Sequence, residues 1–295
     1  MASVNDKLDR VRNCWKALLA AAIAVHAQTD WQAAAGGKKQ FDAASVKLET
    51  EFRPPSYPLD NGNAFKPGGR FSAVFTVMTY LQFAYKVSFS RQQVQAMRAK
   101  LPKWVFSDLF AIEAKADGLP TKDQFRLMMQ SLLAERFHLE VHFETQETAV
   151  YALMLVKSGR LGPKLRLHSD GPPCEDSPAT AFPPQCYVTM ATMKDREIRM
   201  GSRATTMDLL AESLPGPGTG VDRPVVDQTG VTGEVDFELD YHDENPNVPP
   251  GTTPPADPGP TAIEALREQL GLKLESVRLP LRILVVDRIE RPSEN

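Results

Sequence analysis

Residues 223–241 read RPVVDQTGVTGEVDFELDY, and no other stretch of the chain carries so many structural signals in so few residues. A short apolar run comes first, followed by a turn with two glycines and a segment in which apolar and polar residues alternate. Alternation with a period of two is typical of a half-buried β-strand. The sequence therefore predicts two paired strands, at 225–226 and 235–241, joined by a turn at 227–233 in which the glycines adopt positive φ.

Residues on both sides of this stretch carry similar signals. The predicted strands lie at 41–48, 70–74, 110–116, 137–145, 149–157, 235–241 and 281–289, with those at 137–145 and 149–157 forming a hairpin. Ser or Thr three residues before Gln or Glu forms a capping box, which marks the start of a helix. Helices are predicted at 77–87 after Thr76, at 207–214, and after the capping boxes that begin at Ser90, Thr121 and Thr261.

Three pairs of similar segments recur in the same order, at separations of 129, 127 and 134 residues. They match residues 70–78 with 199–207, 110–112 with 237–239, and 132–141 with 266–275, and the first match sets Thr205 against Thr76. Near-constant separations indicate an internal repeat. We therefore expect an α+β fold of two similar lobes, 41–157 and 196–295, each a strand–helix–strand–helix–strand–strand unit that arose by duplication. The alternative is one α+β domain whose helices share similar caps.

The first 27 residues have the composition of a secretory signal peptide. Four Lys or Arg residues precede an apolar run at 17–25, and small residues follow it. This run of about nine residues is shorter than the ~20 that a membrane-spanning helix needs. We expect a cleaved signal at 1–27, a linker at 28–40, a secreted or periplasmic location, and no stable membrane span after cleavage. An uncleaved amphipathic anchor is the alternative.

Charge and cysteine content fit an exported protein. Loss of residues 1–27 removes four Lys or Arg and two Asp residues, which changes the formal net charge from −3 to −5. A mildly acidic chain without a basic stripe is a poor match for nucleic acid. Two cysteines, Cys174 and Cys186, remain in a Pro-rich loop at 158–195, and an even number in an oxidising compartment predicts a disulfide. On the chain-entropy model, a loop of that length gives roughly 3 kcal/mol of stabilisation.

Several of these segments resemble one large family of exported proteins from soil Acidobacteria. The segments that carry the resemblance are 41–48, 69–71, 110–116, 124–137, 150–153, 223–237, 268–275 and the terminal RPSEN at 291–295. That family is a domain of unknown function, also found fused to BlaR-type membrane metallopeptidase sensors. Its units look, more distantly, like the short N-terminal domains of secretins and TonB-dependent receptors. The resemblance implies an extracytoplasmic α+β module and brings no established catalytic residue.

The acidic strand at the end of the opening stretch is the main candidate for chemistry. Carboxylates on one strand face beside an Asp/Asn-containing loop offer the oxygen ligands that calcium prefers. The candidate ligands are Asp236, Glu238, Asp240, Asp243 and Glu244. Asp240 and His242 are the candidate catalytic residues, since a bound cation could activate water beside them. Asp227 is a further candidate, although it fits a turn-capping role better. The alternative for the whole cluster is an acidic face exposed to solvent.

Two hypotheses of function follow. The sequence contains no G-x-S-x-G, H-E-x-x-H, P-loop or G-x-G-x-x-G motif, which favours a binding module for an envelope protein, a peptide or a small molecule. A hydrolase of small esters or lactones, dependent on a divalent cation such as calcium, is the alternative, because sites assembled from distant residues leave no linear motif. No cofactor other than such a cation is predicted.

Overall fold

The computed structural model describes residues 31–56, 59–62, 68–170, 174, 183, 186–215, 218–243 and 259–292. Three β-sheets and the helices packed on them confirm the predicted α+β class. The strands are β1 (Ala43–Glu49), β2 (Arg70–Thr76), β3 (Leu109–Lys115), β4 (Glu140–Leu155), β5 (Leu165–Leu167), β6 (Met190–Lys194), β7 (Glu197–Thr205), β8 (Val225–Asp227), β9 (Val235–His242) and β10 (Leu272–Arg288). After a short helical segment at 31–34, the helices are α2 (Val77–Tyr85), α3 (Arg91–Lys100), α4 (Trp104–Ser107), α5 (Lys122–Arg136), α6 (Met207–Ser213), α7 (Ala262–Gln269) and the 3₁₀ turn η1 (His168–Asp170).

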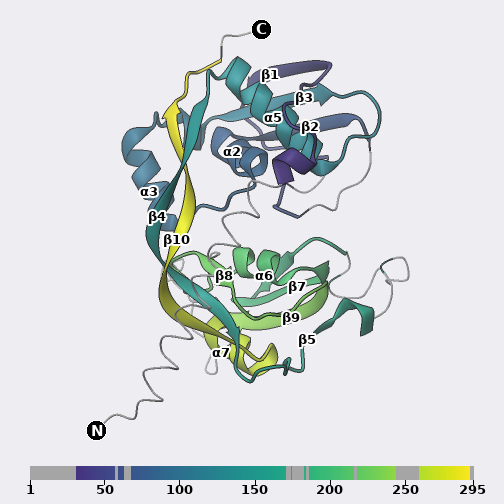
Figure 1. Cartoon of the computed structure of the whole chain (residues 1–295), viewed down its shortest axis with the longest axis vertical. Coiled ribbons are helices and arrows are strands. Elements are labelled where there is room, and N and C mark those ends of the chain that lie inside the picture. The colour runs from purple at the N-terminus through teal and green to yellow at the C-terminus, as the bar shows by residue number, and fades with distance from the viewer. Residues whose placement is uncertain are drawn as a thin grey trace.

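The first lobe is an antiparallel sheet in the order β1-β3-β2, covered on one face by α2 and α5 (Figure 1). Alternate residues of the strands point into one core, where Phe71, Phe110 and Ile112 are almost completely buried. The hydroxyl of Tyr80 on α2 lies 2.9 Å from the carbonyl oxygen of Ala73 and 2.8 Å from that of Phe110. These contacts tie the helix to β2 and β3 at the centre of the core.

The second lobe has the sheet order β5-β9-β7-β6, with α6 and α7 packed on it (Figure 1). All neighbouring strands in this sheet are antiparallel. Phe237, Leu239 and Tyr241 point from β9 into a second core that α6 and α7 complete. Two strands of the sheet, β5 and β6, lie within residues 158–195, so this Pro-rich stretch contributes to the second lobe.

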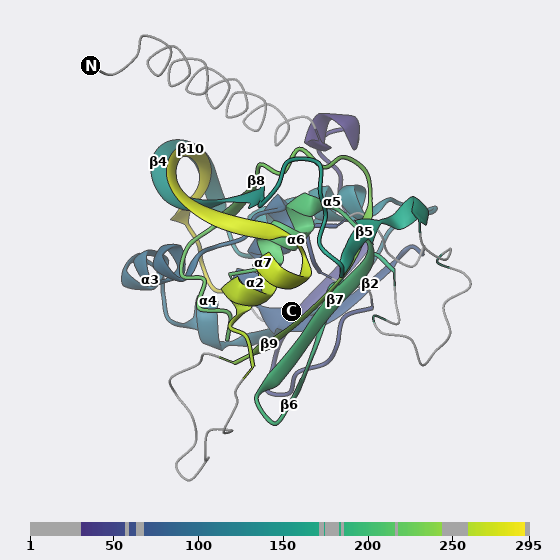
Figure 2. The same ribbon diagram turned by 90° about the horizontal axis from the view of Figure 1, so that it is seen from below.

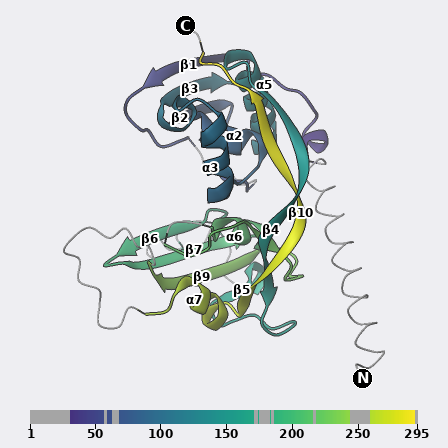
Figure 3. The ribbon, with the colours of Figure 1, turned by 90° about the vertical axis from the view of Figure 1, so that its left-hand side faces the viewer.

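The strands β4 and β10 pair antiparallel along nearly their whole length and connect the two lobes (Figures 1 and 3). At 16 residues, β4 spans about 50 Å. The predicted hairpin at 137–145 and 149–157 is therefore wrong, because residues 140–155 form one continuous strand. The segment between the predicted strands, Gln146–Glu147–Thr148, has no Gly or Asn to adopt the positive φ of a tight hairpin turn. Figure 2 shows the ribbon of β4 and β10 twisting at one side of the molecule.

Each strand of this ribbon contributes to both cores. Leu153, near the end of β4, is buried in the core of the second lobe. Leu284, near the end of β10, is buried in the core of the first lobe, with Val286 packed beside it. Each half of the chain therefore completes the hydrophobic core of the other half.

The strand at 225–226 does not pair with 235–241 as predicted. β8 pairs in parallel with β4, with Tyr151 opposite Val225, whereas β9 lies between β5 and β7. The short apolar run and the alternating segment each predicted a strand correctly, but neither pattern carries information on the partner of that strand. The intervening turn does contain Gly230 and Gly233 at φ of 71° and 86°, as expected.

The predicted helix caps are confirmed at four positions. Thr76 accepts a hydrogen bond from the Thr79 amide, and complete capping boxes begin at Ser90, Thr121 and Thr261. At α6 the cap is Thr206, one residue after the Thr205 that was matched with Thr76. A β-bulge between Ser202 and Thr205 inserts the additional residue.

Five elements follow the same order in the two lobes, β2-α2-β3-α5-β4 in the first and β7-α6-β9-α7-β10 in the second, but the structure changes the separations between the matched positions. The N-caps Thr76 and Thr206 lie 130 residues apart, and the C-caps Phe137 and Leu270 lie 133 apart. Phe75 and Thr205 each precede the N-cap of a matched helix; Phe75 pairs with Phe110, and Thr205 pairs with Val235. Phe110 on β3 therefore matches Val235 on β9, a separation of 125 residues. Sequence similarity therefore placed each match one or two residues away from its structural position.

The predicted disulfide between Cys174 and Cys186 is confirmed, with a Cα–Cα distance of 5.8 Å. The predicted signal peptide at 1–27 lies outside the described residues. In the part of the chain that the structure describes, no helix has the length and apolar character needed to cross a membrane.

Candidate functional site

The acidic strand predicted as a cation site is β9, and its carboxylates face basic side chains. The pairs are Asp236 with Arg166 and His168, Glu238 with Arg199, and Asp240 with Lys164 and Arg199. The Asp240–Lys164 distance is 2.6 Å. A calcium ion at this face would have to separate carboxylates from ammonium and guanidinium groups that already neutralise them. Charge pairing along the face therefore disfavours a calcium site there.

Of the two remaining candidate ligands, only Asp243 lies within the described residues. The backbone of Asp243 exchanges hydrogen bonds with Arg196, whose guanidinium and carbonyl oxygen both take part. Glu244 lies outside the described residues. Among the residues the structure describes, one group brings three side chains with metal-ligand atoms within 4.8 Å of one another, namely His168, Cys174 and Cys186. Because its two cysteines are joined in a disulfide, neither offers a thiolate to a metal.

The two candidate catalytic residues line one cavity of about 400 Å³ at the end of β9. Asp240 is paired with Lys164 there, and its amide N–H donates to the side chain of Gln269. The amide of His242 donates to the carbonyl oxygen of Pro260, while its Nδ1 is buried without a hydrogen-bond partner among the described residues. The structure thus brings both residues to one cavity.

Asp227 has the turn-capping role that its sequence context favoured. Its carboxylate accepts a hydrogen bond of 2.9 Å from the amide of Thr229, and the Thr229 hydroxyl in turn accepts from Val231. These contacts hold the turn between β8 and β9. The carboxylate of Asp227 therefore has a structural explanation.

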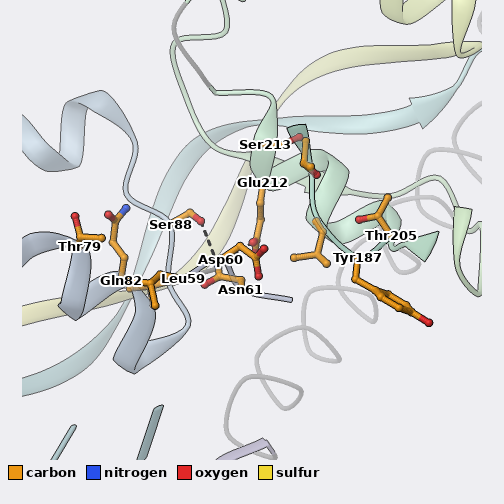
Figure 4. A pocket seen from close by; sticks show the side chains of 13 residues that line it. Leu59, Asp60, Asn61, Thr79, Gln82, Ser88, Tyr187, Thr205, Glu212 and Ser213 are labelled. Carbon is orange, nitrogen blue, oxygen red and sulfur yellow. Dashed lines mark hydrogen bonds between the residues drawn. The ribbon is translucent and has the colours of Figure 1, made fainter. Parts of the chain in front are cut away.

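A second cavity, of about 230 Å³, lies between the two lobes (Figure 4). The first lobe contributes the loop at 59–61, one face of α2 and the segment that follows α2; the second lobe contributes α6 and the residues around Tyr187. Amide and hydroxyl groups dominate the polar lining: Asn61, Thr79, Gln82, Ser88, Thr189, Thr205 and Ser213. Leu59, Val87 and Leu209 supply apolar surface.

The helices α2 and α6 present equivalent positions to this cavity. When their N-caps Thr76 and Thr206 are superimposed, Thr79 corresponds to Leu209 and Gln82 corresponds to Glu212, and all four of these residues line the cavity. Figure 3 shows α6 on the side of the second lobe that faces the first lobe. The cavity therefore lies where corresponding helices of the two lobes meet.

Two acidic groups line this cavity, Asp60 from the first lobe and Glu212 from the second, and Glu212 makes a contact between the lobes. Its Oε2 accepts a hydrogen bond of 2.8 Å from the side-chain amide of Asn61, which joins the lobes across the cavity. The side chain is open to the cavity, yet the surrounding protein removes enough water to raise its pKa to about 7. The neighbouring Asp208 raises that pKa further, whereas Asn61, Lys86 and Arg126 oppose the shift. Near neutral pH, Glu212 can therefore either donate or accept a proton.

Buried cations of α5 hold the loop that carries Asn61. Lys122 Nζ contacts Asp60 Oδ1 at 2.6 Å, and burial lowers the pKa of this lysine to about 8. Arg126 donates to the carbonyl oxygens of Asp60 and Gly62, at 2.9 and 2.6 Å. A Cβ on Gly62 would lie 3.1 Å from Asp60 Oδ1 and 3.2 Å from Leu209 Cδ1 of the second lobe, so a larger residue would have to displace one of these side chains. The loop is thus fixed from both sides.

None of these cavity residues was predicted to be functional. The sequence places Asn61 in a Pro- and Gly-rich loop, where it fits an ordinary turn, and Glu212 on a short helix that has no motif. The available signal was the pair Asp208 and Glu212, two carboxylates four residues apart on one helix, where like charges repel. That signal is weak, because surface helices often carry such pairs.

Comparison with known proteins identifies the family. A model described as protein of unknown function (DUF3738) matches residues 78–289, most of the chain. The chain belongs to this family. No curated protein and no solved structure matches the chain. The DUF3738 match runs from α2 to the end of β10 and includes all cavity residues except Leu59, Asp60 and Asn61.

Proposed function

We propose that this protein is a binding module that holds a small polar molecule in the cavity between its lobes. The observation that carries the proposal is the meeting of Asn61 and Glu212 across a cavity lined by hydroxyl and amide groups. A few convergent polar groups beside apolar surface are typical of ligand sites. Glu212 suits a ligand that bears hydroxyl or amino groups, because a carboxyl group with a pKa near 7 pairs with either.

The size of the cavity favours a small molecule over a peptide or a protein partner. Sites for drug-sized ligands have volumes of roughly 300–1,000 Å³. At about 230 Å³, this cavity fits a smaller ligand, such as a monosaccharide, a polyol or an amine. Such a molecule would be enclosed by both lobes at once, and its binding would stabilise their relative arrangement.

We also propose that the module acts outside the cytoplasm and that its lobes arose by duplication. The Cys174–Cys186 disulfide and the signal-like composition of residues 1–27 support export. The resemblance to acidobacterial exported proteins, some of them fused to BlaR-type sensors, supports the same location. The shared order of elements in the two lobes and the corresponding helices α2 and α6 support duplication.

A thermal-shift screen with the full chain tests the binding proposal. The probes are monosaccharides, polyols and small amines, and a ligand present at 100 times its Kd should stabilise the protein by about 2.7 kcal/mol. We expect Glu212→Gln and Gln82→Leu to abolish the shift, and Gln95→Leu, an exposed change on α3, to retain it. If no probe shifts the melting temperature, or if the shift persists in both cavity variants, the proposal is wrong.

A hydrolase that uses Asp240 and His242 is the second candidate, because both residues line the cavity at the end of β9. The test is turnover of a panel of acyl esters and lactones, with and without chelator. Activity that is lost in His242→Ala and retained in Glu212→Gln would establish this function. Absence of turnover across the panel would remove it.

A further inference from the structure

The disulfide and a histidine lie together in the second lobe, outside both cavities. Cys186 is fixed by its backbone, which bridges to Arg203, and the following amide of Tyr187 donates to the Arg203 carbonyl oxygen at 2.7 Å. Cys174 lies beside His168, with 3.6 Å between Sγ and Nε2. One sulfur of the bridge is therefore in contact with an imidazole, while the other is anchored next to β7.

A buried carboxylate sets the orientation of this imidazole. Nδ1 of His168 lies 2.6 Å from Oδ1 of Asp236, a residue that is 5% exposed. The carboxylate also accepts hydrogen bonds from Arg166 at 3.2 Å and from the amide of Ala204 at 3.0 Å. Asp236 is thereby held on three sides, and the ring it binds directs Nε2 toward Cys174.

This arrangement matches the chemistry that a departing thiolate requires. The sulfur contacts the imidazole, and the imidazole contacts the carboxylate. In cysteine-based catalytic sites, a nucleophile, a base and a group that orients the base are arranged in the same way. A cysteine next to a protonated histidine has a stabilised thiolate, and a more stable thiolate leaves a disulfide faster. A disulfide that only cross-links the chain has no need for an oriented imidazole at one sulfur.

We propose that Cys174–Cys186 is an exchangeable disulfide that reacts with dithiols, with His168 as the catalytic acid and base at Cys174 and Asp236 as its positioning residue. One thiolate of the dithiol attacks Cys186 Sγ. The bond between the two cysteine sulfurs breaks, and its electron pair goes to Cys174 Sγ, which His168 Nε2–H stabilises by donating a hydrogen bond or its proton.

The mixed disulfide joins one sulfur of the dithiol to Cys186 Sγ. The second thiolate of the dithiol then attacks that first dithiol sulfur, and the bond to Cys186 Sγ breaks. This step releases the oxidised dithiol as a disulfide and leaves Cys186 as a thiolate, which takes a proton from solvent. The protein disulfide gains two electrons and the dithiol loses two. In the reverse direction, the reduced protein reduces a disulfide substrate, with Cys174 as the attacking thiolate.

The first test compares the two thiols within one protein. The full chain is reduced with a phosphine and alkylated with iodoacetamide between pH 5 and 9, and the peptides that contain Cys174 and Cys186 are quantified by mass spectrometry. We expect Cys174 to reach half-maximal alkylation at a pH at least about one unit below that of Cys186. Equal midpoints for the two thiols would overturn the proposal, and this comparison needs no variant.

The second test measures the rate at which dithiothreitol reduces the native disulfide at pH 7. We expect His168→Phe to slow reduction about tenfold and to move the alkylation midpoint of Cys174 upward. Asp236→Asn should also raise that midpoint, by altering how the imidazole is held. His142→Phe, which changes an exposed histidine on β4, is the matched control and should leave both quantities unchanged. An unaltered rate and midpoint in His168→Phe would overturn the proposal.

Discussion

The two lobes share the order strand, helix, strand, helix, long strand, but they differ in the elements between the first helix and the central strand, which are α3 and α4 in one lobe and β8 in the other. They also differ in the helix that precedes the long strand. α5 has 15 residues and α7 has 8. When their C-caps are superimposed, the first seven residues of α5 have no counterpart in α7. Those residues include Lys122 and Arg126, which hold the loop at 60–62, and Asp123, which pairs with Arg126.

This difference shows how similar lobes can divide the construction of one site. The additional turns of α5 contact the loop that carries Asn61 through Lys122 and Arg126. On the helices that line the cavity, the second lobe has Glu212 where the first lobe has Gln82. The two helices therefore present different charge at matched positions of one cavity.

Removal of the buried guanidinium should have the largest effect. Arg126→Met deletes the partner of Asp123 and of two loop carbonyl groups, and we expect a loss of about 3–5 kcal/mol in the free energy of unfolding. Urea denaturation measures this loss. Arg91→Met, an exposed change at the start of α3, is the control and should stay within about 0.5 kcal/mol. A similar small loss in Arg126→Met would mean that α5 does not support the loop.

A matched pair of leucine truncations tests the exchange of β4 and β10 between the cores. Leu284→Ala and Leu153→Ala should each cost about 2–5 kcal/mol, because both side chains are buried. Hydrogen exchange should show lost protection in the first lobe for Leu284→Ala and in the second lobe for Leu153→Ala. Loss in the opposite lobe for either variant would contradict the pairing of the ribbon.

The core of the first lobe has a polar contact that the second lobe lacks. Tyr80 corresponds to Leu210, and its hydroxyl bonds to carbonyl groups of β2 and β3. Tyr80→Phe leaves these buried acceptors with one partner fewer and should cost about 1–3 kcal/mol in urea denaturation. In Tyr85→Phe, where the ring packs on Phe143, we expect under about 0.5 kcal/mol. Equal losses would show that the Tyr80 hydroxyl is not specifically required.

The smallest effect on stability should come from Glu212→Gln, which gives α6 the residue that α2 has at the matched position, Gln82. Because the folded-state pKa of Glu212 is about 7, the folded protein retains a proton that the unfolded chain releases near its ordinary value of 4.5. Stability from this group is present below pH 4.5 and is lost as the pH rises to 7. Glu212→Gln should therefore flatten the decline of the urea midpoint between those values.

The control for this pH dependence is Glu264→Gln on α7. The pKa of Glu264 is lowered by hydrogen bonds from Thr261, so its contribution has the opposite sign and is lost as the pH falls. Its removal should therefore change the profile only below about pH 4.5 and leave the decline between pH 4.5 and 7 as it is. An unchanged profile in Glu212→Gln would mean that another group, such as Asp208, controls the titration.

Local sequence signals were reliable where the physics is local. Capping boxes at Ser90, Thr121 and Thr261 depend on residues three apart, and the α+β class depends on periodicity within single elements. The disulfide followed from the count of cysteines. Predictions that required a partner were less reliable: the hairpin at 137–157 is a single strand within residues 140–155, and β8 pairs with β4.

The sequence by itself therefore determined the α+β class, the caps of α2, α3, α5 and α7, and the acidic face of β9, whereas β5, β6 and β7 were not among the predicted strands. The tertiary structure alone decided which basic side chains neutralise that face and which hydrophobic core each end of β4 and β10 enters. It also brought Asn61 into contact with Glu212, 151 residues away. The same holds for His168, which reaches Cys174 and Asp236 through the fold. The physical reason is that caps and periodicity arise from neighbouring residues, whereas a site between lobes depends on packing of distant segments, which no local pattern encodes.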